Sequence, residues 1–451
     1  MKLHGTMRIN DKGHLEIGGC DTVELIKEFG SPLYVMDEES IRSTCRDYYR
    51  SFTAKHNAQV IYASKAFLSK AMCRIIEEEG LGLDVVSGGE LYTALQAGFP
   101  VENIYFHGNN KTPDEIELAL RVGIGRFVVD NFNELCLLNG LAGEQGVKAK
   151  ILFRVTPGIE AHTHEYIRTG QIDSKFGLVM INGQAMEAIQ EALTMANVEV
   201  QGIHCHIGSQ IFELESYQHA VQVMMDFVAD IARKTGLVIK ELNLGGGFGI
   251  YYHGADNPAK IADYAEIVLN TVHEEANKLG LPVPKVIVEP GRSIVGTAGT
   301  TLYTVGSVKH IHGVRTYVAV DGGMTDNPRQ ALYQAKYEAQ LANKAKQPGK
   351  ELVSIAGKCC ESGDMLIWDI LLPKVETGDI LAVSCTGAYN YSMSSNYNRI
   401  CRPAAVLVNQ GKGEVIVRRE TYQDIVRNDV LPERLAVRSR ETAGVTAAAG
   451  K

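Results

Sequence analysis

Several features that mark exported, membrane-spanning or disulfide-stabilised proteins are missing from this sequence of 451 residues. No stretch approaches the roughly 18 consecutive apolar residues that a transmembrane helix requires. The first residues contain no apolar segment of the kind that export signals carry. The nine cysteines are odd in number and form no C-x-x-C pair, so we expect a reducing, cytoplasmic location. No group of cysteines and histidines has zinc-ligand spacing, and we therefore expect no bound metal.

An excess of positive charge is also missing. The 45 lysines and arginines are outnumbered by 53 acidic residues, which gives a formal net charge of −8. Without a basic block, neither a nucleic acid nor an anionic membrane is expected as a partner. The chain is 45% apolar and 22% charged, which excludes a disordered or collagen-like protein. The length fits two or three domains.

Eight short apolar segments rich in β-branched residues alternate with helical patterns over the first two thirds of the chain. Apolar residues recur at helical spacing in Ser69–Glu79, Asp114–Val122 and Tyr217–Thr235. Such alternation predicts parallel strands joined by right-handed crossovers. Eight units in this length favour a closed (β/α)8 barrel, with an open doubly wound sheet as the alternative. The eight predicted strands are Val60–Ala66, Leu83–Ser87, Ile104–His107, Phe127–Asp130, Lys150–Val155, Val200–Ile207, Leu242–Leu244 and Val286–Val288.

The pattern changes after Arg292, because the later strand-like segments have no regular helices between them. Antiparallel pairing in a second, sandwich- or barrel-like β domain is the natural interpretation. The N-terminal segment contains two further strand-like stretches, His14–Ile17 and Leu33–Val35, and is expected to join that domain. We therefore predict an N-terminal segment at 1–37, a barrel at 38–295, a C-terminal β domain at 296–440 and a flexible tail at 441–451.

Unusual residues collect at the carboxyl ends of the predicted barrel strands, where the active sites of such barrels lie. Lys65 stands at the end of the first strand. A strand-end lysine is ordinarily solvated, but a partly desolvated amine can form a Schiff base. His204 and His206 end the sixth strand, where alternation sends both to one face. They could be metal ligands or packed core residues, but further ligands are missing nearby, and a ring-stacking imidazole is the better functional interpretation.

Two more strand ends carry chemistry. Gly245–Gly249 follows the seventh strand, where barrels often bind phosphate and where backbone N–H groups can approach an anion. The eighth strand ends in Glu289-Pro290-Gly291-Arg292, in which the carboxylate forms either an ion pair or a contact with a protonated heteroaromatic nitrogen. A lysine, an imidazole, a phosphate-type loop and a carboxylate together form the set that holds pyridoxal 5′-phosphate.

The motifs at these positions resemble those of the fold-type III pyridoxal-phosphate decarboxylases, most closely the members that act on diaminopimelate. The resemblance extends from about Leu33 to Tyr422. It is carried by Y-A-x-K-A at Tyr62–Ala66, D-V-V-S-x-G-E at Asp84–Glu90, H-G-N-N-K at His107–Lys111, H-I-G-S-Q-I at His206–Ile211, G-G-G-F-G at Gly245–Gly249, E-P-G-R at Glu289–Arg292, D-N-P-R-x-A-L-Y at Asp326–Tyr333, C-E-S-x-D at Cys360–Asp364 and G-A-Y at Gly387–Tyr389.

The resemblance implies a role for each matching residue. Lys65 corresponds to the lysine that joins the cofactor covalently, and Cys360 corresponds to the proton donor. The cofactor-binding set is then Lys65, His206 (stacked on the ring), Ser209, Gly247, Glu289 (paired to the ring nitrogen), Pro290, Gly291, Arg292 and Tyr389. The substrate-binding set is Arg292, Arg329, Tyr333, Glu361 and Tyr389. In this family the cysteine and its glutamate come from a second subunit, which implies a homodimer.

The implied reaction converts meso-2,6-diaminopimelate to L-lysine and CO2. Two arginines, Arg292 and Arg329, suit a substrate with a second carboxylate. The alternative is a decarboxylase that acts on ornithine, arginine or carboxynorspermidine. A racemase of the same fold type is disfavoured, because Glu289 stands where such enzymes have an arginine. A regulatory homologue without activity would have no reason to keep Lys65 and Cys360. Lys358 and Gln330 depart from the family pattern beside key residues without replacing them.

Overall fold

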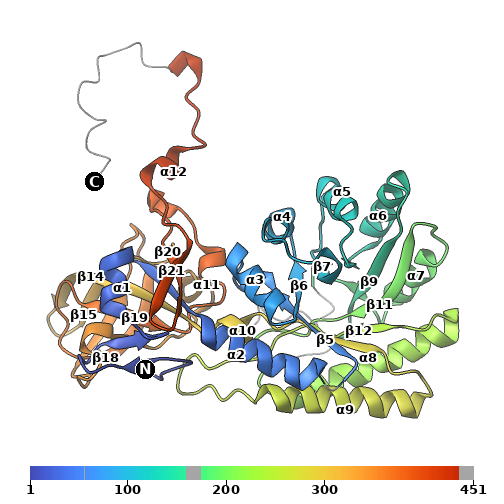
Figure 1. The fold of residues 1–451 in the computed structure, drawn as a ribbon, viewed down its shortest axis with the longest axis horizontal. Coiled ribbons are helices and arrows are strands. Elements are labelled where there is room, and N and C mark those ends of the chain that lie inside the picture. The colour runs from blue at the N-terminus through green and yellow to red at the C-terminus, as the bar shows by residue number, and fades with distance from the viewer. Residues whose placement is uncertain (55, 159–173, 436–451) are drawn as a thin grey trace.

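The structure is a computed structural model that describes residues 1–54, 56–158 and 174–435. Figure 1 shows two lobes, one a barrel wrapped by helices and the other rich in strands. The N-terminal segment, in dark blue, lies in the β-rich lobe beside strands from the C-terminal part of the chain. The predicted tail at 441–451 lies outside the described residues.

Eight parallel strands close into a barrel. Each strand pairs with the next one around the ring, and β13 pairs with β5 to close it. The predicted barrel is therefore confirmed, and the open-sheet alternative is wrong. A short strand, β10 (Leu178–Val179), adds to the edge of β9. The barrel strands are β5 (Ala58–Ala63), β6 (Gly82–Val85), β7 (Ile104–Phe106), β8 (Arg126–Val129), β9 (Ala149–Thr156), β11 (Val198–His204), β12 (Glu241–Asn243) and β13 (Lys285–Val288).

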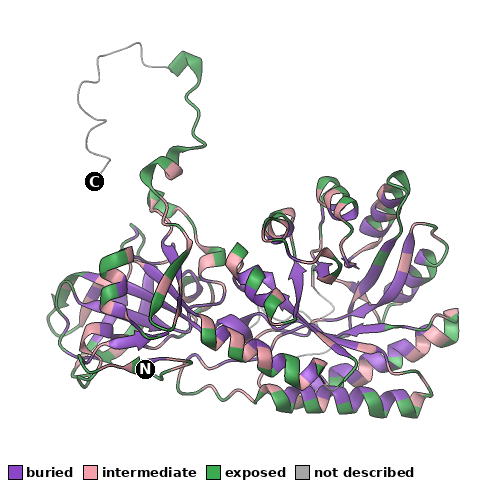
Figure 2. Cartoon of the chain, in the orientation of Figure 1, coloured by how far each residue is buried: buried purple, intermediate pink, exposed green. Residues whose placement is uncertain are grey.

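Side chains fill the barrel, so its interior is a core and not a channel. A layer of five buried residues from five different strands occupies the centre: Ile61, Tyr105, Val128, Leu152 and Ile287. The outward faces of the strands pack against the helices, and Figure 2 shows the strands buried and the helices buried on one side only. Such packing leaves the rim of the barrel as the place for a binding cavity.

The helices around the barrel begin at side chains that cap them. Ser69, Ser87, Thr112 and Asn131 each accept a hydrogen bond from a backbone N–H in the first turn of the following helix. The three predicted helices are present as α3, α5 and α8. The helices that cover the barrel are α2 (Glu38–Tyr48), α3 (Lys70–Glu78), α4 (Gly88–Gln96), α5 (Pro113–Val122), α6 (Phe132–Glu144), α7 (Gln184–Ala192), α8 (Leu214–Thr235) and α9 (Ile261–Leu279).

The second lobe is built around the long strand β14 (Gly299–Ile311). β4 (Leu33–Asp37) pairs antiparallel with β14 and parallel with β20 (Ala404–Asn409), so the N-terminal segment joins this lobe as predicted. The remaining strands of its main sheet are β15 (Arg315–Val320), β16 (Ala339–Leu341), β17 (Glu351–Ala356), β18 (Met365–Leu372), β19 (Ile380–Ser384) and β21 (Lys412–Val417).

Two strand pairs of this lobe are parallel, although antiparallel pairing was expected. They are β4 with β20 and β15 with β17. Parallel neighbours need a long crossover connection. The whole barrel lies between β4 and β20 in the sequence, and residues 321–350 lie between β15 and β17. Because the period of two that marks a strand is the same in both pairings, the sequence pattern does not distinguish them.

Smaller elements complete the described chain. A three-stranded sheet of β1 (Arg8–Ile9), β2 (Leu15–Ile17) and β3 (Cys20–Asp21) precedes α1 (Thr22–Phe29). After β21 the chain projects away from the β-rich lobe as an arm (residues 418–435), which contains α12 (Tyr422–Val426) (Figure 1). Among the described residues, no helix combines the length and the apolar character needed to span a bilayer.

Candidate active site

A cavity of about 690 Å³ lies at the carboxyl ends of the barrel strands and is closed on one side by the β-rich lobe. Strand ends of the barrel supply most of its wall, and α11 (Arg329–Tyr333) and the loop after β19 supply the rest. Ten residues predicted from sequence line it: Lys65, His206, Ser209, Gly247, Glu289, Gly291, Arg292, Arg329, Tyr333 and Tyr389. Residues more than 300 positions apart are thus brought to one place.

Lys65 lies on a 3-10 turn, Ser64–Ala66, directly after β5. The predicted strand Val60–Ala66 was therefore too long at its end, because the chain must turn at the barrel rim. The turn is fixed on both sides of the lysine: Ser64 Oγ donates to Glu90 Oε2 at 2.7 Å, and the backbone N–H of Tyr389 donates to Ala66 O at 2.8 Å. The neighbours of Lys65 are buried, whereas its own side chain is exposed and reaches the cavity. This arrangement presents an amine from a rigid backbone.

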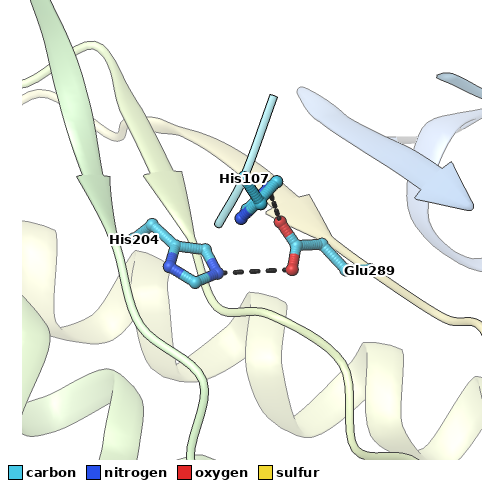
Figure 3. Close-up of side chains that lie close together, drawn as sticks. All are labelled: His107, His204 and Glu289. Carbon is cyan, nitrogen blue, oxygen red and sulfur yellow. Dashed lines mark hydrogen bonds and ion pairs between the residues drawn. The ribbon is translucent and has the colours of Figure 1, made fainter. Parts of the chain in front are cut away.

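Glu289 is the centre of a buried polar cluster, which Figure 3 shows with two of its partners. Its Oε1 atom accepts a hydrogen bond from Asn243 Nδ2 at 2.7 Å and lies 2.9 Å from His107 Nε2. Its Oε2 atom lies 3.3 Å from His204 Nε2. Asp84 extends the cluster, since its Oδ1 atom lies 3.8 Å from His107 Nε2.

The charges of this cluster follow from its contacts. Burial works against the ionised form of Glu289, but the two histidines outweigh it and hold the pKa of this carboxyl well below its usual range. Burial raises the pKa of Asp84 to about 7. Burial also lowers the pKa of His204 to about 4, so this histidine is neutral near pH 7. An ionised carboxylate therefore faces the cavity.

His206 presents a neutral ring to the same cavity. Burial, together with the charge of Lys65, lowers the pKa of His206 well below its usual value. The backbone N–H of Gly246 donates to His206 Nδ1 at 3.2 Å, which leaves that nitrogen without a proton. His206 lies just beyond the end of β11 and not within it, but it shares the cavity wall with His204, as alternation predicted.

The glycine run after β12 is shaped by close backbone contacts. A Cβ atom on Gly246 would lie 2.2 Å from Glu289 O. Gly247 has a φ of +97°, and a Cβ there would lie 2.5 Å from Gly208 O. Only glycine fits either position. The backbone thus forms an open cradle beside Ser209 and Arg292, which is the form that anion-binding loops take.

Two buried arginines line the cavity on the side of the β-rich lobe. Arg292 donates to Tyr252 Oη at 2.6 Å and to Ser209 Oγ at 2.8 Å. Arg329 donates to Tyr337 Oη at 2.9 Å. No carboxylate of the described chain forms a salt bridge with either guanidinium. Buried cations that have hydroxyl groups and tyrosine rings, but no carboxylate of the described residues, as partners are suited to bind an anionic group of a ligand.

Three predicted residues do not line the cavity. Pro290 lies behind it, where its carbonyl oxygen accepts the backbone N–H of Ala63. Cys360 and Glu361 are exposed in the loop between β17 and β18. That loop is held firmly: Cys359 N donates to Asp364 Oδ2 and Cys360 N donates to Asn398 Oδ1, each at 2.7 Å.

The structure also brings in residues to which the sequence reasoning gave no role. His107 and Asp84 each begin a motif that served above only as evidence of the family resemblance. Asp84 lies at the end of β6 and His107 follows β7, and this strand-end position could have identified both as candidate site residues. The argument that His204 has no further potential ligands nearby was wrong, since ligand atoms of His107, His204 and Glu289 lie within 4.8 Å of one another. Arg154 and Tyr252 also line the cavity but have no distinguishing pattern.

The residues present fit pyridoxal phosphate. An amine, a neutral aromatic ring, an ionised carboxylate and a glycine cradle with a hydroxyl and a guanidinium all line one cavity. A Cβ at Gly246 or Gly247 would collide with the backbone oxygen of Glu289 or Gly208, so the close approach of these segments that shapes the cradle requires glycine at both positions. These are the groups with which proteins bind this cofactor and tune it.

Comparisons with known proteins agree with this fit. Residues 38–296 match the family described as pyridoxal-dependent decarboxylase, pyridoxal binding domain. The chain is 55% identical over 431 residues to a diaminopimelate decarboxylase of Bacillus subtilis (strain 168), covering 95% of this chain and 98% of that protein. It is 47% identical to a diaminopimelate decarboxylase of Synechocystis, covering 95% and 93% of the two chains.

A solved structure has the same fold as this chain. The crystal structure of diaminopimelate decarboxylase from M. jannaschii in complex with L-lysine superposes with a TM-score of 0.89 at 40% identity, covering 95% of this chain and 99% of that one. The predicted cofactor and the predicted carboxy-lyase class are confirmed by these matches. The chain belongs to the pyridoxal-dependent decarboxylases and, within them, to the diaminopimelate decarboxylase family.

Proposed function

We propose that this chain removes CO2 from meso-2,6-diaminopimelate and releases L-lysine, the last step of lysine biosynthesis. The observation that carries the proposal is a pair of buried arginines that have no acidic partner among the described residues and that line the same cavity as Lys65 and Glu289. Two relatives reported above are named diaminopimelate decarboxylase, which supports the same substrate. The free state of all nine cysteines supports action in the cytoplasm.

Within the cavity, Lys65 would hold the cofactor covalently, and the Gly245–Gly247 cradle with Ser209 would hold its phosphate. When bound, pyridoxal phosphate supplies a conjugated ring that accepts the electron pair left by departing CO2. Glu289 would supply a negative charge to the ring nitrogen and so favour its protonated form. This role disfavours a racemase, which needs a weaker electron acceptor. His206 packs its neutral ring against the cofactor.

The arginines select the substrate. Arg329 and Arg292 face the cavity beside the ring of Tyr389, with guanidinium carbons 6.0 Å and 4.8 Å from its centroid. Forked donors of this kind bind a carboxylate with two parallel hydrogen bonds. Diaminopimelate carries a second carboxylate at its far end, whereas ornithine carries only an ammonium group there, which two guanidiniums repel. Tyr333 lines the same cavity and is assigned to the substrate. Glu361, which lies beside Cys360 outside its own cavity, would accept from the far ammonium group of a substrate in the cavity of a second copy.

We assign the return of a proton to Cys360, acting in the cavity of a second copy of the chain. Its exposed position outside its own cavity supports a homodimer. The turn that carries Asn398 connects the Cys360 loop to the arm at residues 418–435, because Arg399 donates to Ile425 O at 2.9 Å and to Asp429 at 2.6 Å. Large apolar side chains of the arm are exposed, among them Tyr422 at 81% and Val430 at 86%. A second copy packed on this surface would bury them and deliver Cys360.

The test is the release of CO2 from a panel of diaminopimelate, ornithine, arginine, lysine and carboxynorspermidine. We expect diaminopimelate to react, and the others to react at least about 10²-fold more slowly, because each leaves the buried arginines unpaired. Faster release from ornithine or carboxynorspermidine would contradict the proposed substrate without affecting the cofactor site.

A further inference from the structure

The cluster around Glu289 contains more ionisable groups than contact with a ring nitrogen requires. His107 lies between two carboxylates, with its Nε2 atom 2.9 Å from Glu289 Oε1 and 3.8 Å from Asp84 Oδ1. All three side chains are buried, and Asp84 Oδ1 accepts no hydrogen bond from any residue that the structure describes. Two buried carboxylates around one imidazole call for a physical explanation, because each unpaired buried charge costs several kcal/mol.

We propose that His107 and Asp84 are positioning residues: His107 carries the positive charge that keeps Glu289 ionised, and Asp84 keeps His107 protonated. The inference rests on the proposed role of Glu289 toward the cofactor ring. Neither residue needs to touch the cofactor, and both act through Glu289.

Electrostatics in the cluster support this order of action. Burial lowers the pKa of His107, but the carboxylates of Asp84 and Glu289 outweigh burial and raise it. The other charged groups that face the cluster are Lys65, Glu90 and Arg154. The positive charge of Lys65 lowers the pKa of Asp84, and the negative charge of Glu90 raises it. The positive charge of Arg154 lowers the pKa of His107. Removing His107 would therefore leave Glu289 buried beside a neutral histidine, and its pKa would rise.

His204 provides an internal comparison. It is as deeply buried as His107, and its Nε2 atom lies 3.3 Å from the other oxygen of Glu289 (Figure 3). Burial makes it neutral near pH 7, as described above. The two histidines thus contact the same carboxylate but differ in charge. Replacing His107 with glutamine removes a positive charge and a contact, whereas replacing His204 with glutamine removes only a contact.

A bound metal ion is the competing explanation for two histidines and a glutamate. Asn243 donates a hydrogen bond to the same Glu289 oxygen that faces His107, which fits an ion pair supported by a neutral donor. Metal analysis of the purified apoenzyme separates the two explanations, because the proposal requires none at this site.

The experiment titrates the apoenzymes of wild type, His107→Gln, Asp84→Asn and His204→Gln with pyridoxal phosphate between pH 6 and pH 9. The quantity compared is the ratio of variant Kd to wild-type Kd at each pH, read from the visible absorbance of the bound cofactor. For His107→Gln we expect a ratio of at least about 10 at pH 6, falling toward 1 as the pH rises. The sign follows from a raised Glu289 pKa, because the carboxyl is protonated below it and ionised above it.

The other variants define what the result means. Asp84→Asn should leave the ratio near 1 at pH 6, where Asp84 is itself mostly protonated, and raise it above pH 7, where the ionised carboxylate supports the charge of His107. This variant carries the test if His107→Gln does not fold. His204→Gln should give a ratio that changes less with pH than that of His107→Gln, because it removes a contact with Glu289 but no positive charge near pH 7. A ratio for His107→Gln that is constant across the range, or stoichiometric metal in the apoenzyme, would overturn the inference. Because the readout is cofactor affinity, a wrong substrate would leave this result unaffected.

Discussion

At the scale of single residues, Cys360 raises the clearest question, because an exposed thiol is assigned to a reaction inside a cavity that it does not line. Cys360→Ala should bind pyridoxal phosphate normally and lose activity by roughly 10²–10⁴-fold, the usual effect of removing a well-placed acid. The matched control is Cys136→Ala, which removes the other exposed cysteine of the described chain. An unchanged rate for Cys360→Ala would remove this residue from the mechanism.

Arg329 offers a separate test of substrate binding. We expect Arg329→Ala to raise the KM for diaminopimelate by roughly 30-fold or more, since losing one partner of a buried charge pair costs about 2–5 kcal/mol. Cofactor affinity should change far less. Arg233→Ala on the exposed face of α8, where Arg233 pairs with Asp230, serves as the control. Equal losses of substrate and cofactor affinity would mean that Arg329 only supports the structure.

The sequence located residues of the cavity where strand-end position and residue type coincide, although the roles assigned to them stay predictions. Lys65 and Glu289 follow strands directly, and their chemistry is specific enough to be noticed in a single sequence. His107 and Asp84 occupy equivalent places, but a buried histidine or aspartate has many ordinary explanations. The role that we propose for them rests on the 2.9 Å and 3.8 Å distances between side chains, which no sequence pattern contains.

At the scale of elements, the barrel was predictable because each strand is a short apolar run and each helix has an apolar face. The residues at which the strands and helices end were less predictable. The strand β5 ends before Lys65, and β11 ends before His206, because the chain must turn at the rim to close the cavity. Contacts between distant segments determine the parallel strand pairs of the second lobe and the course of the projecting arm. A local sequence pattern does not contain these contacts.

The arm gives a prediction at this scale. The double variant Val430→Asp with Leu431→Asp should dissociate the proposed dimer and lower activity, because two charges would be placed in a buried apolar contact. Sedimentation measures the change in mass. Val314→Asp is the control, since Val314 is 75% exposed in the turn between β14 and β15. A double variant that stays dimeric and active would exclude the arm from the interface.

At the scale of the whole molecule, we propose that two chains share each active site. A mixture of Lys65→Ala and Cys360→Ala chains should therefore recover activity, although each variant alone is inactive. Random exchange makes about half of the dimers mixed, and each mixed dimer has one intact site of two, so about a quarter of wild-type activity is expected. A mixture no more active than its components would show that both residues serve the same chain's cavity.

The central claim is that the cofactor is joined to Lys65 in the cavity at the barrel rim. Borohydride reduction of the holoenzyme, followed by peptide mass spectrometry, tests it most directly because reduction makes the linkage permanent. The account predicts a pyridoxyl group on the peptide that contains Lys65, and none on the same peptide of Lys65→Ala. A label on another lysine of wild type, or a colourless protein that takes up no cofactor, would contradict it.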